Sequence, residues 1–364
     1  MSQKEIDNLS YPCTHNYILE TLEPVGDLKE RMELIPHDFF NGNNFLDIGC
    51  NKGYFSLLAE RNCKYVESVE PSQEYYNLCV KLGLNVKNTN FRDYTTDMEF
   101  DRVMLGNVIH YLFRESGWDF IKKLACISTD LILIECPTER CSDLKDMFPN
   151  YNYDVFKEKM GEFFILSWEI DSPSPDRKIM MWKRKDDQFS KRYDIKDIEL
   201  GNVIKGDANS TTYLSDKITK MYPKINKNTI KIASLSPISN GLIGFVYDGD
   251  KCVGWVENKL NGDLLEYKQE QNMVFKKICE HERFLSRVGY FDLDTSMINF
   301  IDMKLFDKGA VIPVSDLNED WINKFEIMLR NSYDILYDEF IKKLTETLKT
   351  KDSKKIEESY ELAR

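Results

Sequence analysis

The sequence has 364 residues and a formal net charge of −12, with 42% hydrophobic and 30% charged residues. That length is enough for two or three domains, and the hydrophobic content indicates packed cores rather than disorder. The acidic balance argues against a sequence-independent nucleic-acid binder, so the basic segment 217–231 is interpreted as a solvated charged surface. The start of the chain lacks a signal-peptide core and no run of about 18 apolar residues occurs, which predicts no transmembrane segment and a cytoplasmic location.

The cysteine and histidine patterns favour neither disulfides nor zinc. The nine cysteines are an odd number, are scattered and form no CxxC pair, as is typical of reduced thiols in a cytoplasm. The four histidines are too few and too dispersed to indicate a zinc site.

The first half of the chain alternates between strand and helix patterns. Strands are predicted, in chain order, at residues 44–49, 65–70, 84–91, 100–108, 130–136, 161–170 and 177–185, and helices at 54–62, 72–83 and 116–128. This alternation predicts a mostly parallel sheet with helices on both faces. The turn signal DSPSPD makes the last two strands an antiparallel hairpin at the sheet edge.

The carboxyl end of the first strand carries the motif D-x-G-x-x-x-G, formed by Asp47, Gly49 and Gly53. Ligands of such sheets bind at this edge, where glycine lets the backbone approach closely and the next helix presents free N–H groups. Glu70 ends the following strand, 17 residues after Gly53, where a carboxylate can accept hydrogen bonds from ribose hydroxyls. These features also suit NAD, but the loop lacks the GxGxxG spacing, and Asp47 suits a ligand with a cationic amino-acid group.

On these residues, the segment from about 30 to 185 resembles the class I S-adenosylmethionine-dependent methyltransferases. LDIGCNKG looks like their first motif, SVEPS like their second, NFRDY like the loop that meets the adenine amine, and MLGNVIHYL like the substrate-facing fourth strand. The family often carries a glycine at the position of Asn51, and asparagine tolerates left-handed backbone. The resemblance implies S-adenosylmethionine as the cofactor, held by Asp47, Gly49, Cys50, Asn51, Gly53, Glu70, Pro71, Asp93 and Asn107.

The methyl acceptor is less defined by the sequence. Methyl transfer to oxygen or nitrogen mostly needs alignment, and a base helps when the nucleophile is a hydroxyl. His110 follows Asn107 at the edge of the fourth strand, so it is either a base or phosphate-orienting group, or a structural histidine hydrogen-bonded in that loop. Arg177, in the hairpin, is interpreted as a surface residue rather than part of the rim.

After a charged linker at residues 186–194, the pattern changes to short strands, a helix and acidic loops. Asp294 and Asn299 have the five-residue offset of a kinase catalytic loop, so residues 195–345 resemble a small kinase-like domain. The resemblance implies ATP and Mg²⁺, with Asp294 as the catalytic base, Asn299 and Asp316 as metal ligands, and Lys220 on the phosphates.

The second domain departs from the kinase pattern at three places. Asp292 stands where a kinase has histidine, residues 224–238 contain no glutamate to pair with Lys220, and the phosphate-covering loop has one glycine, Gly206. The alternative is an α+β interaction domain whose acidic loops are only surface.

The C-terminal segment predicts a long amphipathic helix. We expect its apolar stripe to pack in the core, with self-association as the alternative, and residues 346–364 to be a charged, frayed tail. The stripe consists of Trp321, Phe325, Met328, Leu329, Leu336, Phe340 and Leu344.

The predicted fold is therefore α/β: a Rossmann-like methyltransferase domain at residues 1–185, then a smaller α+β kinase-like domain with a C-terminal helix. This order resembles the bifunctional methyltransferase–kinase enzymes that cap bacterial O-antigen or capsule polysaccharides. The resemblance implies methylation of a glycan or sugar-phosphate end, with phosphorylation of the acceptor, at the cytoplasmic face of the inner membrane. The alternative is a methyltransferase whose second domain is a non-catalytic binding module, acting on an RNA phosphate, a protein or a small molecule.

Overall fold

In a computed structural model, the chain separates into two compact units, Met1–Lys185 and Asp186–Arg364. The structure describes residues 16–141, 151–185, 189, 191–198, 200, 202–206, 211–214, 217–222, 225–239, 241–258, 271–294, 300–301, 304–305, 311–332 and 338–362. Within these ranges, no helix is long and apolar enough to cross a membrane.

The first unit is built on a seven-stranded sheet with strand order β5-β4-β3-β6-β7-β9-β8. Strands β3 to β7 pair in parallel, whereas β9 is antiparallel to both β7 and β8, which confirms the predicted sheet and its closing hairpin. The strands are β3 (Asn44–Ile48), β4 (Tyr65–Val69), β5 (Val86–Lys87), β6 (Phe100–Gly106), β7 (Ser128–Pro137), β8 (Phe164–Asp171) and β9 (Arg177–Arg184).

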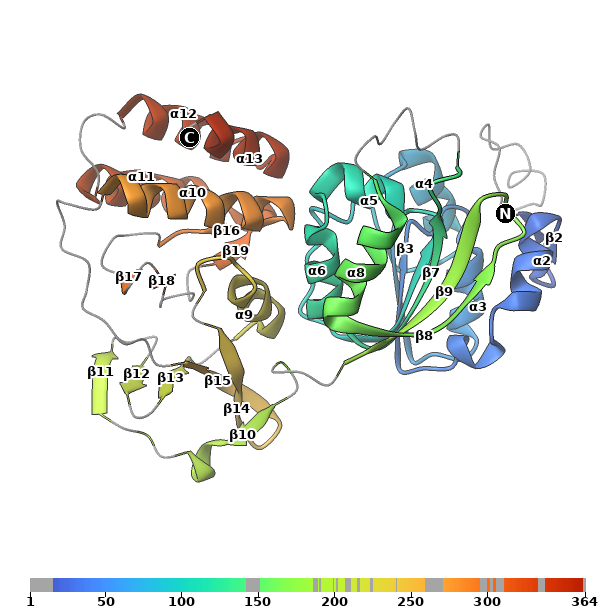
Figure 1. Ribbon diagram of the computed structural model, residues 1–364, viewed down its shortest axis with the longest axis horizontal. Helices are drawn as coiled ribbons and strands as arrows, with labels where there is room; N and C mark the ends of the chain where they lie inside the picture. The colour runs from blue at the N-terminus through green and yellow to red at the C-terminus, as the bar shows by residue number, and fades with distance from the viewer. Residues whose placement is uncertain are drawn as a thin grey trace. The chain divides into compact units, whose positions relative to one another are not determined.

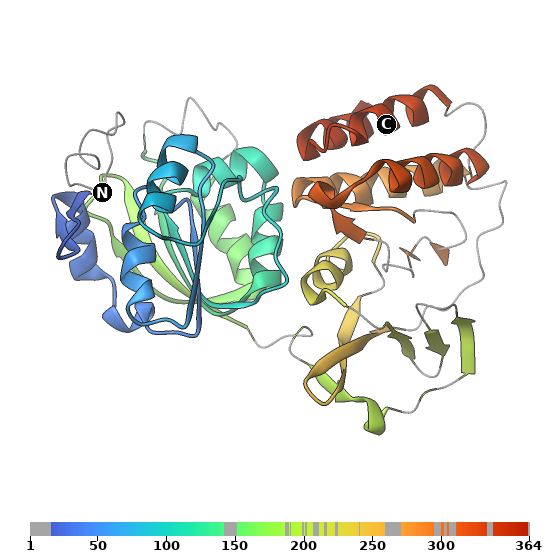
Figure 2. The same cartoon turned by 180° about the vertical axis from the view of Figure 1, so that it is seen from behind.

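Helices cover both faces of this sheet, α2, α3 and α4 on one and α5, α6 and α8 on the other (Figures 1 and 2). The core of the first of these layers contains Phe40, Phe45 and Phe55, whose rings stack on one another. The elements are α2 (Asp27–Leu34), α3 (Tyr54–Glu60), α4 (Gln73–Lys81), α5 (Ile109–Ser116), α6 (Asp119–Ile127) and α8 (Tyr153–Phe163), with a 3₁₀ turn η1 (His37–Phe40) and a hairpin β1 (Asn16–Ile18)–β2 (Glu23–Val25) before β3.

The second unit contains a six-stranded mixed sheet with strand order β10-β14-β15-β13-β12-β11. Two further two-stranded ladders pair β16 with β19 and β17 with β18. The strands are β10 (Arg192–Asp194), β11 (Asn202–Gly206), β12 (Thr211–Leu214), β13 (Lys217–Met221), β14 (Leu242–Asp248), β15 (Lys251–Asn258), β16 (Tyr290–Asp292), β17 (Phe300–Ile301), β18 (Lys304–Leu305) and β19 (Val311–Pro313).

Helices supply the larger core of the second unit, and they differ from the expected single helix and tail. The apolar stripe is divided between two helices and is used inside the unit, where Phe325, Leu329 and Leu344 are buried; Leu336 lies outside the described residues. The elements are α9 (Lys227–Ser234), α10 (Gln271–Arg287), α11 (Glu319–Ser332), α12 (Asp338–Leu348) and α13 (Ser353–Leu362), with 3₁₀ turns η2 (Ile195–Asp197) and η4 (Val314–Asp316).

The segment expected to be a frayed charged tail instead forms the end of α12 and helix α13. Ile356 and Tyr360 of α13 are buried in the same core as α10 and α11. Arg287 Nε of α10 also contacts Glu357 Oε1 at 2.7 Å. The charges of this segment therefore lie on the outer face of a packed helix.

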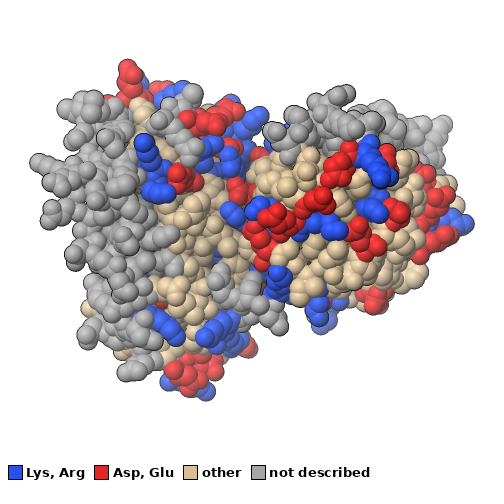
Figure 3. All heavy atoms as spheres, viewed as in Figure 1, with Lys and Arg blue, Asp and Glu red and all other residues tan. Residues whose placement is uncertain are grey.

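Charged side chains are interspersed on the surface. On the face in Figure 3, acidic and basic groups alternate over the described residues without a broad basic field.

Candidate functional site

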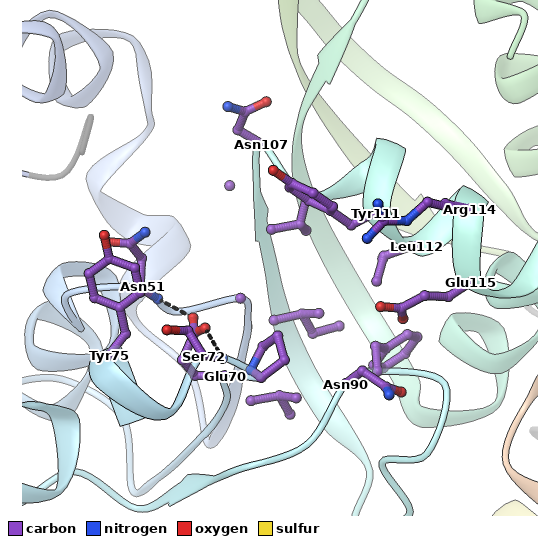
Figure 4. A pocket seen from close by; sticks show the side chains of 17 residues that line it. Asn51, Glu70, Ser72, Tyr75, Asn90, Asn107, Tyr111, Leu112, Arg114 and Glu115 are labelled. Atoms are coloured by element: carbon purple, nitrogen blue, oxygen red, sulfur yellow. Dashed lines mark hydrogen bonds between the residues drawn. The ribbon is translucent and has the colours of Figure 1, made fainter. Parts of the chain in front are cut away.

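A cavity of about 580 Å³ lies in the first unit at the carboxyl ends of β3, β4 and β6. This volume is in the range of small-molecule and cofactor sites. Figure 4 shows side chains from four parts of the chain around it. The lining residues are Ile48, Gly49, Asn51, Val69, Glu70, Pro71, Ser72, Tyr75, Asn90, Phe91, Gly106, Asn107, Val108, Tyr111, Leu112, Arg114 and Glu115.

Glu70, the residue after β4, is held in place by the backbone. Its Oε2 accepts a hydrogen bond from the Asn51 N–H at 2.8 Å, and its Oε1 accepts one from the Ser72 N–H at 2.8 Å. Burial raises the pKa of Glu70, and these two N–H groups act against that rise. The carboxylate is thus fixed at the cavity wall, where it can accept hydrogen bonds from ribose hydroxyls.

The loop after β3 adopts left-handed backbone at Gly49, Asn51 and Gly53, with φ of 74°, 53° and 77°. The expectation that asparagine tolerates this conformation is confirmed. A Cβ on Gly49 would lie 2.5 Å from Cγ1 of Val108, another lining residue, so glycine lets the loop close against the end of β6. Gly53 is not among the residues that line the cavity. The absence of a Cβ at Gly53 instead leaves room for the side chain of Leu84.

Two residues of the motif lie beneath the loop rather than in the cavity wall. Asp47 is 1% exposed, and its Oδ2 accepts a hydrogen bond from Ser56 Oγ at 2.6 Å. Burial, with repulsion from Glu70, raises the pKa of Asp47 to about 7, against the hydrogen bond from Ser56. Cys50 is buried, with its Sγ 3.7 Å from Cys79 Sγ. Neither residue is among those that line the cavity, and their contacts with a cofactor stay a prediction.

The loop predicted to meet adenine presents Asn90 and Phe91 to the cavity, whereas Asp93 is not among the lining residues. The Asp93 Oδ2 accepts a hydrogen bond from Asn90 Nδ2 at 2.9 Å, and its N–H donates to Asn90 Oδ1 at 2.9 Å. Below the loop, Lys123 is fully buried and its Nζ donates to the Arg92 carbonyl at 2.7 Å. Burial lowers the pKa of Lys123 to about 7.

The end of β6 brings together residues that the sequence placed apart. Asn107 lines the cavity with φ of 59°, and its Oδ1 accepts a hydrogen bond from Arg177 Nη1. Arg177, interpreted as a surface residue, is half-buried and reaches the site from β9, so that interpretation was wrong. His110 is buried and outside the lining, its ring 4.1 Å from that of Tyr111, which does line the cavity. The role of His110 as a base stays a prediction.

Helix α5 contributes functional residues that sequence reasoning missed. Tyr111, Leu112, Arg114 and Glu115 all line the cavity. Residues 108, 111, 112 and 115 follow the i, i+3, i+4, i+7 spacing of one helix face, so the pattern was available. The resemblance of MLGNVIHYL to a strand motif does not indicate that a helix begins at Ile109, directly after β6.

In the second unit, Lys220 has a glutamate partner that the sequence did not predict. Its Nζ lies 4.0 Å from Glu257 Oε2, and both side chains are buried. Trp255 Nε1 donates to Glu257 Oε1 at 2.7 Å, and the Lys220 ammonium lies 5.6 Å from the centre of the Trp255 ring. The partner therefore comes from the neighbouring strand β15 and not from α9, the helix within residues 224–238.

A buried polar network holds the start of the loop that contains Asp294. The Asp294 N–H donates to Asp292 Oδ1 at 2.9 Å. Asp292 Oδ2 contacts His281 Nε2 at 3.2 Å, and His281 Nδ1 contacts Ser236 Oγ at 2.6 Å. Burial and repulsion from Asp292 raise the pKa of Glu282 well above its usual value.

Two of the three residues predicted for catalysis and metal binding in the second unit, Asp294 and Asp316, are placed apart by the strand register. Strands β16 and β19 are antiparallel, with Asp292 opposite Val311 and Tyr290 opposite Pro313. Asp294 and Asp316 therefore lie beyond opposite ends of this ladder, and Asp316 is exposed. Asn299 lies outside the described residues, and among those described no group of three metal-ligating side chains occurs.

Neither a protein-family model nor a curated protein sequence matches the chain. It is similar to the solved structure of the N-methyltransferase NodS from Bradyrhizobium japonicum, with 13% identity over 40% of this chain and 86% of that one and a TM-score of 0.35. It is also similar to the bifunctional kinase-methyltransferase WbdD, with 15% identity over 98% of this chain and 94% of that one and a TM-score of 0.38. A third similar structure is magnesium protoporphyrin IX methyltransferase from Synechocystis PCC 6803 with bound S-adenosylmethionine, with 14% identity, 40% and 72% coverage and a TM-score of 0.34. At these identities the likeness is one of fold alone.

Proposed function

We propose that the first unit is an S-adenosylmethionine-dependent methyltransferase. The observation that carries the proposal is the Glu70 carboxylate, which two backbone N–H groups fix at the wall of a cavity of about 580 Å³. This is the position, at the end of the second strand of a parallel sheet, from which a carboxylate holds a ribose.

Other residues present in the cavity fit an adenosyl ligand with an amino-acid end. The close approach of the Gly49 loop to Val108 leaves backbone groups of Gly49, Gly106 and Asn107 along the wall. The apolar side chains of Phe91 and Leu112 suit a purine ring. When bound, the cofactor would supply an activated methyl group, and these residues would orient it at the edge of the sheet.

The acceptor side is defined by Asn107, Arg177 and Tyr111. Arg177 holds the Asn107 amide by a hydrogen bond, and Tyr111 is 45% exposed at the same end of β6. A planar guanidinium beside an amide and a phenol suits polar oxygen groups. We therefore propose an oxygen of a glycan or sugar-phosphate end as the acceptor.

A calorimetric titration of the full chain with S-adenosylhomocysteine tests the cofactor assignment. We expect binding by the wild type and at least about a tenfold loss in Glu70→Ala, because hydrogen bonds to a charged group are each worth about 1.5–3 kcal/mol. Glu74→Gln, an exposed carboxylate on α4, is the matched control and should bind as the wild type does. No heat with the wild type at millimolar ligand would refute the proposal.

For the second unit, the buried Lys220–Glu257 pair favours phosphoryl transfer from ATP to the acceptor as a second proposed activity. In protein kinases, a strand lysine paired with a helix glutamate places an ammonium on the nucleotide phosphates; here the glutamate comes from the neighbouring strand. Titration with ATP and Mg²⁺, with S-adenosylhomocysteine already bound, tests this. Heat that disappears in Lys220→Met supports a nucleotide site. No heat at millimolar ATP would favour the alternative, a non-catalytic binding module.

A further inference from the structure

Glu115 is the acidic side chain at the α5 end of the cavity. It lines the cavity together with Asn90, Phe91 and Leu112. Figure 4 shows its carboxylate turned from α5 into the cavity, with Asn90 nearby and with Glu70 and Asn51 on the opposite side. The cavity thus has a carboxylate at each end, one suited to the ribose and one beyond it.

The Glu115 carboxylate has an acceptor atom with nothing bound to it. Its Oε2 is buried and has no hydrogen-bond partner among the described atoms. A buried acceptor without a partner is destabilising by about 1–3 kcal/mol, so a ligand donor that reaches Oε2 would remove this cost. Burial, with repulsion from Asp93, raises the pKa of Glu115, as expected for a carboxylate short of donors.

The backbone of Glu115 is tied to the loop that forms the floor of this end. Arg92 Nη1 donates to the Glu115 carbonyl at 2.8 Å, and Lys123 Nζ in turn donates to the Arg92 carbonyl at 2.7 Å. These bonds fix Glu115 relative to Asn90 and Phe91, which precede Arg92 in the loop. The Glu115 carboxylate therefore has a defined place beside the apolar side chains of Phe91 and Leu112.

Asp93, the predicted partner of adenine, is not available in the same way. Its Oδ2 accepts a hydrogen bond from the Asn90 side-chain amide, and its Oδ1, like Glu115 Oε2, is buried without a hydrogen-bond partner among the described atoms. Unlike Glu115, however, Asp93 is absent from the residues that line the cavity. The Asp93 backbone N–H in turn donates a hydrogen bond to Asn90 Oδ1. The Asp93 side chain therefore shapes the loop, and Glu115 is the acidic lining residue at this end of the cavity, opposite Glu70.

We propose that Glu115 selects the purine of the cofactor, by accepting a hydrogen bond from the 6-amino group of adenine and disfavouring a 6-oxo purine. The inference rests on the proposed function of the first unit. The 6-amino group can donate a hydrogen bond to the buried Glu115 Oε2. A 6-oxo group cannot donate one, and its oxygen would face the carboxylate oxygen without a hydrogen between them. A site built to bond a ligand N–H rejects an analogue that lacks it more strongly than an apolar slot does.

The experiment compares two ligands that differ at this position, S-adenosylhomocysteine and S-inosylhomocysteine, by calorimetry with the full chain. We expect the wild type to bind the inosyl ligand about 10-fold to 100-fold more weakly, the range for one hydrogen bond to a charged group. In Glu115→Gln the preference should fall to within about threefold, because the amide accepts through oxygen or donates through nitrogen. Glu74→Gln, which removes the same charge from an exposed site, should keep the wild-type ratio.

The outcomes separate this inference from the function beneath it. No binding of S-adenosylhomocysteine by the wild type would overturn the methyltransferase proposal and the inference together. If the wild type binds S-adenosylhomocysteine and S-inosylhomocysteine with nearly equal affinity, the methyltransferase proposal stands and the inference about Glu115 is overturned. This outcome needs no variant. An unchanged preference in Glu115→Gln, with thermal unfolding confirming a folded protein, would also overturn it.

Discussion

Asp47 gives the sharpest quantitative test of the site. The substitution Asp47→Asn keeps the shape of a fully buried side chain that accepts a hydrogen bond from Ser56 Oγ, and it removes the ability to ionise. Burial and the nearby Glu70 raise the pKa of Asp47 from 3.8 to about 7. The unfolded chain therefore loses this proton at lower pH than the folded chain does.

The sign and size of the effect follow from this difference in pKa. Below the unfolded pKa of 3.8 both states are protonated and Asp47 has no effect on stability. As the pH rises toward 7, the unfolded state ionises while the folded state does not, so the free energy of unfolding falls. The loss is about 2 kcal/mol at pH 5 and about 4 kcal/mol at pH 9, at about 1.4 kcal/mol for each unit of pKa difference.

Asp47→Asn should therefore stabilise the ligand-free protein, and increasingly so at higher pH. The assay is calorimetric unfolding between pH 5 and pH 9, following the transition that S-adenosylhomocysteine raises. At roughly 2–4 °C per kcal/mol for a unit of this size, the gain in unfolding midpoint of the variant should grow by about 4–8 °C across that range. A gain that stays constant with pH, or shrinks, would refute the idea that a buried ionisation at Asp47 weakens the fold.

Three further substitutions test other parts of the structure. Gly49→Ala should lower the unfolding midpoint and the affinity for S-adenosylhomocysteine, because its Cβ would meet Val108 at 2.5 Å in a left-handed residue; unchanged melting and binding would contradict the close packing of this loop. Lys123→Met should raise the free energy of unfolding, and the gain should be about 2 kcal/mol smaller at pH 9 than at pH 7, because the lysine has a pKa of about 7 in the folded protein and 10.5 in the unfolded chain. Denaturant titrations at the two pH values measure this gain. A gain that is larger at pH 9 than at pH 7 would contradict the lowered pKa. Asp316→Ala should leave ATP–Mg²⁺ heats at the wild-type value while Lys220→Met removes them, and a loss in Asp316→Ala would contradict the separation of Asp294 from Asp316 by the strand register.

The sequence predicts the sheet of the first unit well because its central strands are largely buried. The runs 44–48 and 100–106 are apolar enough to identify without knowledge of their neighbours. Helix α5 was missed because the same apolar run that forms β6 continues into it, and only the left-handed turn at Asn107 separates them. In the second unit, the spacing of apolar residues could not show that one stripe belongs to two helices, α11 and α12, that share a core.

The sequence predicts the site residues whose placement follows from their position at the end of a strand. It does not predict those whose placement depends on the packing of side chains from distant parts of the chain. Glu70 and Asn51 follow from their places at strand ends, and the structure brings them into contact. Asp47 and Asp93 have the expected positions in the chain, but neighbouring side chains turn them to other partners. Arg177 reaches Asn107 across the sheet, from far along the chain, which no local pattern indicates.

The packing of α13 has a consequence for the order in which the chain folds during synthesis. Every strand of the seven-stranded sheet lies within the first 185 residues, so the first unit can fold as soon as that length has left the ribosome. The core of the second unit is different, because Ile356 and Tyr360 belong to one cluster with residues of α10 and α11, and with Ile238 still earlier in the chain. Until residues 353–362 emerge, the apolar side chains of α10 and α11 that share a core with α13 stay uncovered, and exposed apolar surface of this kind favours aggregation.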